Sequence, residues 1–106
     1  MTSCIKQHWS SIADSELSEA TVRALHQPAE NFRVYVNEVA AATPFSIKAG
    51  HDFVLYVLEG ACTINVDNGT QELIAGEFVQ LQAGVYPCQS GSQNGVRLIK
   101  VFSRVA

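Results

Sequence analysis

The amino-acid sequence predicts an all-β domain, an antiparallel sandwich or barrel with a short helical segment before it. Downstream of Asn31, apolar and polar residues alternate along short runs, as expected for strands with one buried face. Gly or Pro bounds these runs at intervals of roughly ten residues, which is typical of antiparallel sheets. The Asp67-Asn68-Gly69 sequence is a strong hairpin signal, because Asn and Gly tolerate positive φ angles.

Length and composition fit one small domain. The chain has 106 residues, of which 47% are hydrophobic, enough to build a single core. Its formal net charge is −3, and its seven Lys and Arg residues are scattered rather than gathered into the basic stripe that a phosphate backbone requires. We therefore expect no nucleic-acid partner.

The sequence carries no pattern typical of export, membrane insertion or disulfide bonding. Residues 1–11 contain no uninterrupted apolar run, and no window approaches the roughly 18 consecutive apolar residues of a membrane span. The three widely spaced cysteines, Cys4, Cys62 and Cys88, favour free thiols over a disulfide framework or a zinc cluster. We expect a cytoplasmic protein with no membrane partner.

Residues 1–30 are predicted to form a helical segment that packs on the barrel or on a partner. A helix is expected between Ser11 and Gln27, with Ser11 as its N-cap, Asp14 three residues later and an imperfect apolar stripe. Pro28 ends it, because the residue before a proline disfavours helical geometry. The barrel is then expected over residues 31–106.

The predicted strands follow one another through the barrel region. In the first, NFRVYVNEV, the side chains of Phe32, Val34 and Val36 share one face. The later runs are DFVLYVL, with Gly60 as its break, then ACTINV, TQELIA, EFVQLQ, VYPCQ and GVRLIKVFSRV. The turn residues between them predict an antiparallel arrangement.

The last of these runs is apolar on both faces. Leu98 and Phe102 lie on one face, and Ile99 and Val101 lie on the other. Burial on both sides needs a second layer, which we expect a partner subunit to supply. Exposed strand edges favour pairing as well, so a homodimer is predicted.

Three matches in a fixed order carry a resemblance to a known family. The strand Tyr56-Val57-Leu58-Glu59-Gly60 is followed by a hairpin, then by Gly76-Glu77 and by Gln82-Ala83-Gly84. This order, within residues 32–102, resembles the two motifs of the cupin superfamily. The resemblance implies a double-stranded β-helix, the cupin or jelly-roll barrel, and a homodimer whose N-terminal segment crosses to the neighbour.

The metal ligands of the cupin family have no counterpart here. In the family, a His-x-His pair and a Glu in the first motif and a His in the second hold Fe, Mn, Ni or Zn. The matching positions are Phe53 for the Glu, Pro87 for the last His, and either Ser46 and Lys48 or Ile47 and Ala49 for the pair. Because Phe and Pro offer no side-chain donor atom, we expect a degenerate metal site, with no metal and no other cofactor.

A barrel of this kind is instead suited to a small organic ligand. The candidate ligand-binding residues are Lys48, His51, Phe53, Gln82, Tyr86 and Cys88. Phe53 makes the former metal position apolar, whereas Lys48 either points inward toward a ligand or is solvated on an edge strand. No catalytic arrangement is recognised, so the sequence leaves open whether the protein is an enzyme.

Two other functions stay open. One is a metal-dependent enzyme of dioxygenase or isomerase type, whose ligands have moved to His51, Asp52 and either Cys88 or an N-terminal histidine, His8 or His26. The other is a purely structural or protein-interaction barrel with a filled interior. The favoured hypothesis is a cupin-like small-molecule-binding or non-catalytic barrel.

Overall fold

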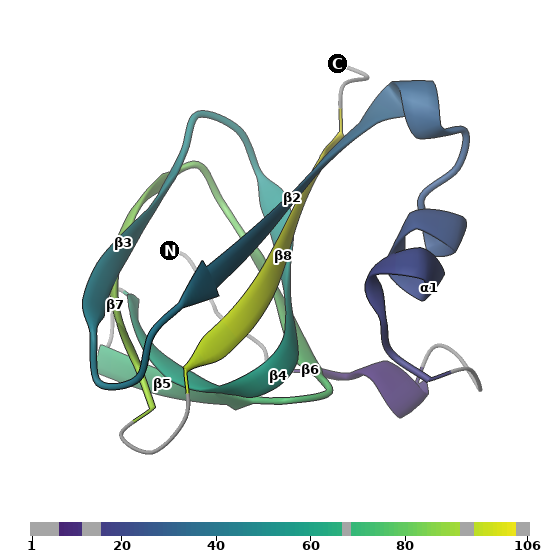
Figure 1. Cartoon of the computed structure of the whole chain (residues 1–106). Coiled ribbons are helices and arrows are strands. Elements are labelled where there is room, and N and C mark those ends of the chain that lie inside the picture. Colours follow the sequence, from purple (N-terminus) through teal and green to yellow (C-terminus); the bar gives the residue numbers. More distant parts are fainter. Residues whose placement is uncertain (1–6, 12–15, 67–68, 92–94, 104–106) are drawn as a thin grey trace.

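The computed structural model describes residues 7–11, 16–66, 69–91 and 95–103. These residues form eight strands and one α-helix (Figure 1). The elements are β1 (Gln7–His8), α1 (Glu19–Leu25), β2 (Phe32–Val39), β3 (Pro44–Ala49), β4 (Phe53–Val66), β5 (Gly69–Ile74), β6 (Glu77–Leu81), β7 (Gly84–Ser90) and β8 (Val96–Ser103). Short 3₁₀ turns at Trp9–Ser11 and Ala29–Asn31 flank the helical segment.

The strands pair into two antiparallel sheets that share the long strand β4. One sheet has the order β1-β6-β4-β8-β2, and in the other β3 pairs with β7 while β4 pairs with β5 and β7. Together they form the predicted barrel, with β3 and β7 on one side and β2 and β8 on the other (Figure 1). Both β2 and β3 are edge strands, because each pairs with one neighbour only in the described part of the chain.

Strand β4 passes from one sheet to the other at Gly60. The residues up to Gly60 pair with β6 and β8, and those from Ala61 onward pair with β5 and β7. Gly60 has a φ angle of 77°, and a register shift between Val57 and Glu59 marks a bulge just before it. The predicted break at Gly60 is therefore wrong: the strand bends there and continues.

Alternating side chains divide the core into two clusters. The cluster inside the barrel consists of Ile47, Phe53, Leu55, Val57, Cys62, Ile64, Leu73, Val79, Leu81, Tyr86, Cys88, Val96 and Leu98. The outer cluster consists of Trp9, Val22, Tyr56, Phe78, Ile99 and Val101. Both faces of β4 and of β8 are therefore buried, because each strand contributes side chains to both clusters.

The chain's own N-terminal segment supplies the second layer over β8. Val22 of α1 is fully buried, and the ring of Trp9 lies edge-on to that of Tyr56 at 5.8 Å. The side chain of His26 shares a 2.9 Å hydrogen bond with the hydroxyl of Tyr56. Strand β8 thus does not itself require a partner subunit, and the homodimer stays a prediction.

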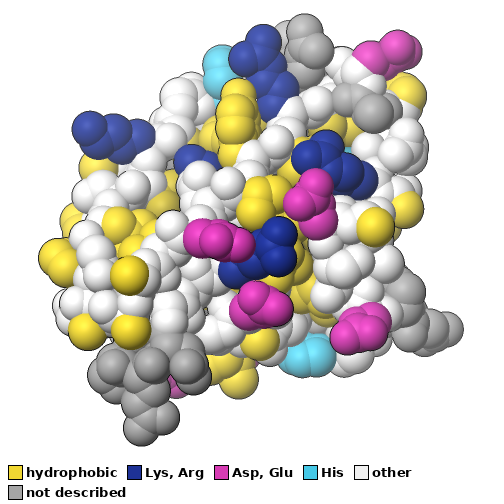
Figure 2. Space-filling view, viewed as in Figure 1, with side chains coloured by type: hydrophobic (Ala, Val, Ile, Leu, Met, Phe, Trp, Pro, Cys, Tyr) yellow, Lys and Arg dark blue, Asp and Glu magenta, His cyan; other side chains and the backbone are white. Residues whose placement is uncertain are grey.

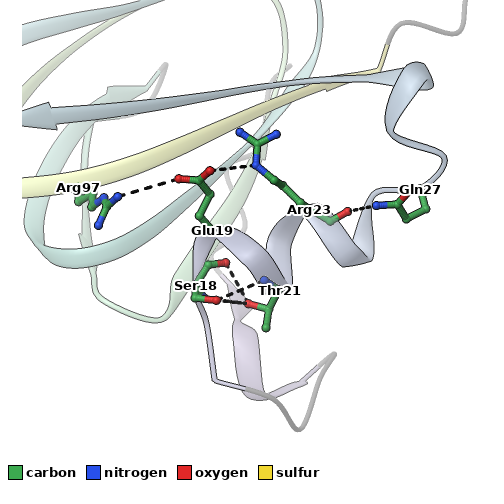
Figure 3. Close-up of polar contacts among 6 residues, drawn as sticks. All are labelled: Ser18, Glu19, Thr21, Arg23, Gln27 and Arg97. Carbon is green, nitrogen blue, oxygen red and sulfur yellow. Dashed lines mark hydrogen bonds and ion pairs between the residues drawn. The ribbon is translucent and has the colours of Figure 1, made fainter.

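The N-cap of helix α1 lies seven residues after the predicted one, because Ser18 and not Ser11 caps the helix. The Ser18 hydroxyl accepts from the backbone N–H of Thr21 at 3.2 Å, and the Thr21 hydroxyl accepts from that of Ser18 at 2.8 Å (Figure 3). Ser11 instead ends a 3₁₀ turn and donates to the carbonyl of His8, and Asp14 lies outside the described residues. The helix is then tied to the barrel by an ion pair, at 4.0 Å, between Glu19 and Arg97 of β8.

Two strands were not predicted from the sequence. Strand β1 has only two residues, and Pro44–Ala49 forms strand β3, whose inward side chains are Phe45, Ile47 and Ala49.

No helix within the described ranges is long and apolar enough to cross a membrane.

The contact between His26 and Tyr56 predicts a pH dependence of stability. Burial lowers the pKa of His26 below its usual value of 6.5, so the folded state favours the neutral ring. The unfolded chain then binds the proton more readily than the folded one. The contribution of His26 to the free energy of unfolding is therefore complete above about pH 6.5 and falls as the pH drops below that value. We expect urea unfolding between pH 7.5 and 5.5, a window of about one unit either side of the ordinary histidine value, to show this loss.

The substitution His26→Gln is expected to flatten that pH dependence, since the titrating ring is removed. The same substitution at His51, whose side chain is exposed, is the matched control and should retain it. A slope unchanged in His26→Gln would contradict the assignment to this ring.

Candidate functional site

An open groove of about 1020 Å³ lies between the edge strands β2 and β3. One wall comes from neighbouring β2 and β8, where Arg33 pairs with Phe102 and Tyr35 with Lys100. The opposite wall comes from the end of β3, which contributes Lys48, and from the loop after it. The groove therefore combines basic and aromatic side chains from segments that are distant in the sequence.

The alternation of β2 sets the wall that it contributes. Phe32, Val34 and Val36 pack in the outer cluster, as predicted, so that Arg33 and Tyr35 project from the other face toward the groove.

A row of aromatic rings leads from the groove into the barrel. The ring of Tyr35 lies 5.7 Å from that of Phe102, and Phe102 stacks on Phe53 at 5.3 Å. Phe53 in turn lies 6.1 Å from Tyr86, in an edge-on arrangement. Such pairs each contribute about 0.5–1.5 kcal/mol beyond their buried area. The row joins two of the predicted site residues, Phe53 and Tyr86, to the groove.

The positions that match the cupin ligands present no metal-binding atoms to the interior. Ile47 and Phe53 are buried in the inner cluster and Ala49 packs against it, while Ser46 and Lys48 are exposed. On β7, Pro87 is exposed, and its neighbours Tyr86 and Cys88 point inward instead. The inside of the barrel is thus apolar at these positions.

The six predicted site residues fall into three environments. Lys48 and His51 line the groove with exposed side chains, so the structure resolves the alternatives for Lys48 in favour of the edge strand. Phe53, Tyr86 and Cys88 are buried inside the barrel. Gln82 has an exposed side chain that borders a smaller cavity of about 530 Å³, on the side of the N-terminal segment.

Tyr86 and Cys88 are held by backbone carbonyls. The Tyr86 hydroxyl donates to the carbonyl oxygen of Gln82 at 2.6 Å, and the Cys88 thiol donates to the carbonyl oxygen of Tyr86 at 3.3 Å. Burial, with a smaller effect from the nearby Cys62, raises the pKa of Cys88 to about 12. Burial also raises the pKa of Cys62 to about 11. Both groups stay thiols at neutral pH, so neither is an activated nucleophile.

The residues of the displaced metal site are not brought together. Asp52 accepts a hydrogen bond from the backbone N–H of Ala83 at 3.1 Å, and His51 beside it is exposed. His26 contacts Tyr56, and His8 contacts the hydroxyl of Ser10 at 2.8 Å. Within the ranges that the structure describes, no three His, Cys, Asp or Glu side chains form a group able to hold a metal ion.

Four groove residues were not singled out from the sequence: Arg33, Tyr35, Lys100 and Phe102. The available signal was Lys100, which lies between Leu98 and Phe102 on the inward face of an otherwise apolar run. A lysine in such a position marks the point where the barrel opens to solvent, because lysine is seldom buried. Arg33 and Tyr35 join it only through the β2–β8 register.

Comparisons with solved structures show what this arrangement is similar to. A cupin protein from Bacteroides fragilis matches with a TM-score of 0.57 and 18% identity, over 72% of this chain and 68% of that one. The cupin_2 domain of an XRE-family transcriptional regulator from Enterobacter cloacae matches with a TM-score of 0.58 and 12% identity, over 94% and 95%. A salicylate 1,2-dioxygenase from Pseudaminobacter salicylatoxidans matches with a TM-score of 0.55 and 19% identity, over 67% of this chain and 20% of the dioxygenase.

No protein-family model and no curated protein matches the sequence. The structural matches share less than a quarter of their residues with this chain, so they establish the fold and leave the activity open. The double-stranded β-helix predicted from the sequence is confirmed. The chain has the fold of the small cupin proteins.

Proposed function

We propose that this protein binds a small organic molecule at the open end of the barrel, without the metal ion of the cupin enzymes. One observation carries the proposal: the inward side chains at the metal-ligand positions are Ile47, Ala49 and Phe53, which have no lone pair to offer a cation. The apolar interior adjoins the groove at Phe102, whose ring stacks on Phe53 and also lines the groove.

The groove offers apolar surface and polar groups to a ligand, in nearly equal parts. Small-molecule sites are concave and mostly apolar, with a few polar groups that fix the orientation of the ligand. Here Tyr35 and Phe102 provide flat apolar surface, and Lys48 and Lys100 provide donors beside it. The similar folds occur in a transcriptional regulator and in a dioxygenase, so the fold itself is compatible with either a binding or a catalytic role.

The first test is the metal content of tag-free protein, measured by elemental mass spectrometry before and after incubation with Fe, Mn, Ni and Zn. We expect far less than one equivalent of any metal. One equivalent that is lost in His51→Ala would overturn the proposal in favour of a metal-dependent enzyme with displaced ligands.

The second test is thermal stabilisation by a library of small organic molecules, since a ligand that binds only the folded state raises its melting temperature. Compounds that stabilise the wild type are expected to lose their effect in Tyr35→Ala, because that ring is 44% exposed and lines the groove. A library without one stabilising compound would instead support a structural or protein-interaction barrel.

A further inference from the structure

The fold gathers positive charge in the groove of a protein whose net charge is negative. The chain has seven basic and ten acidic residues. Three of the basic residues, Arg33, Lys48 and Lys100, line the groove together with a single acidic residue, Asp52. The local charge is therefore opposite in sign to that of the whole chain, although the sequence shows the basic residues scattered.

These three basic residues differ from the others that the structure describes. Arg23 pairs with Glu19 at 3.0 Å, and Arg97 pairs with Glu38 at 3.4 Å. Within the described ranges, Arg33, Lys48 and Lys100 have no carboxylate partner. Figure 2 shows the same contrast: basic side chains near the top of this face lie around apolar ones, whereas those at its centre lie against acidic ones.

Lys100 is the most constrained of the three. Its side chain is half-buried on the inward face of β8, and its ammonium nitrogen lies 5.8 Å from the centre of the Tyr35 ring. A ring attracts the cation but accepts no conventional hydrogen bonds from its three N–H donors. An anionic oxygen at the groove is the natural partner for those donors, because hydrogen bonds between ionised groups are the strongest available.

We propose that the groove binds a small organic carboxylate with a flat apolar body. The carboxylate lies beside Lys100 and Arg33 on the wall formed by β2 and β8, and Lys48 faces it from the opposite wall. The flat body lies against the rings of Tyr35 and Phe102. This inference deepens the proposed small-molecule binding and rests on it. A long polyanion such as nucleic acid fits less well, because the net charge of −3 repels it outside the groove.

Asp52 offsets only one of these three positive charges, and its carboxylate also has a structural role. Its carboxylate accepts the backbone N–H of Ala83 and so joins the loop after β3 to the loop before β7. The second wall of the groove is fixed by that bond, which holds Lys48 and His51 on the far side from Lys100.

The test compares benzoate with benzamide, which has nearly the same shape and no charge, by isothermal titration calorimetry in a low-chloride buffer. We expect benzoate to bind at least about tenfold more tightly, a ratio that corresponds to one charge-assisted hydrogen bond. Adding salt should lower the affinity for benzoate and leave the affinity for benzamide unchanged, because only benzoate is bound through its charge.

Variants assign the effect to the groove. Lys100→Met keeps roughly the length of the side chain and removes its charge. It should lower the affinity for benzoate about tenfold and leave the affinity for benzamide unchanged. Arg33→Gln and Lys48→Gln should each lower the affinity for benzoate about threefold, because an exposed charge contributes less binding energy than a half-buried one. Arg23→Gln removes one charge from α1, away from the groove, and should change neither affinity. Thermal melts establish that each variant is folded.

The outcomes separate this inference from the function on which it rests. Equal binding of benzoate and benzamide, or equal losses in Lys100→Met and Arg23→Gln, would overturn the selection of anions and leave small-molecule binding in place. Binding of neutral library compounds alone would do the same. Absence of binding by benzoate, benzamide and every library compound would overturn both.

Discussion

Replacing Gly60 by alanine is expected to destabilise the protein by more than about 3 kcal/mol, a large part of the roughly 5–15 kcal/mol by which domains are stable. The φ angle of 77° at Gly60 is one that L-residues rarely adopt. A Cβ atom there would also overlap the carbonyl oxygen of Gly95, which is backbone and has little room to move. The measurement is urea unfolding followed by circular dichroism.

Two other glycines separate the causes of that loss. Gly69 has a φ angle of 133° but nothing within 4 Å of an added Cβ, so Gly69→Ala tests backbone strain alone and should cost about 1 kcal/mol. Gly50 has neither a positive φ nor a neighbour within 4 Å, so Gly50→Ala should change stability by less than about 0.5 kcal/mol. Similar losses at Gly60 and Gly50 would contradict the sharp bend in β4.

Replacing Trp9 by alanine is expected to cost about 3–5 kcal/mol, as for other large buried aromatic residues. The side chain of Trp9 is 4% exposed and packs against Tyr56 in the outer cluster. Its loss should also expose the outer face of β8, where Ile99 and Val101 lie. We expect a lower unfolding midpoint and stronger binding of a hydrophobic dye.

Leu25→Ala is the control for the Trp9 substitution, because Leu25 belongs to the same N-terminal segment but is 47% exposed. This substitution should lower the free energy of unfolding by less than about 1 kcal/mol. If Trp9→Ala cost no more than Leu25→Ala, the segment would not be the layer that covers the barrel.

The sequence predicted the faces of the strands well, because burial on one side imposes a period of two wherever it occurs. Phe53, Leu55 and Val57 point into the barrel, and Ile99 and Val101 point outward. The sequence was less informative about what covers the outer face. Apolar side chains indicate that a layer is needed, but they do not distinguish a partner subunit from the chain's own N-terminal segment.

The predicted boundaries of helices and strands were wrong where two local sequence signals were equally good. Ser11 and Ser18 are each followed three residues later by a residue able to complete a cap, and only the packing of Val22 selects the second. The predicted strand end at Gly60 was wrong for a similar reason, because a glycine with a positive φ angle fits a turn and a bulge equally well.

Two of the residues that were singled out in the sequence, Lys48 and His51, line the groove. Phe53 and Tyr86 lie inside the barrel instead, with their ring centres 6.1 Å apart. The groove residues Arg33 and Lys100 were missed, because they become neighbours only through the pairing of β2 with β8. Sequence patterns report the face on which a side chain lies, whereas the composition of a site that spans several strands depends on their register.

The place of β8 in its sheet has a consequence for how the protein is made. This last strand lies between β4 and β2, and it carries Ile99 and Val101, on which the N-terminal segment packs. During synthesis, β2 has no partner among the described strands until β8 has left the ribosome, and the surface on which the N-terminal segment docks is incomplete until then. Strand β2 therefore waits for β8, and closure of the barrel is expected to be a late and slow step of folding.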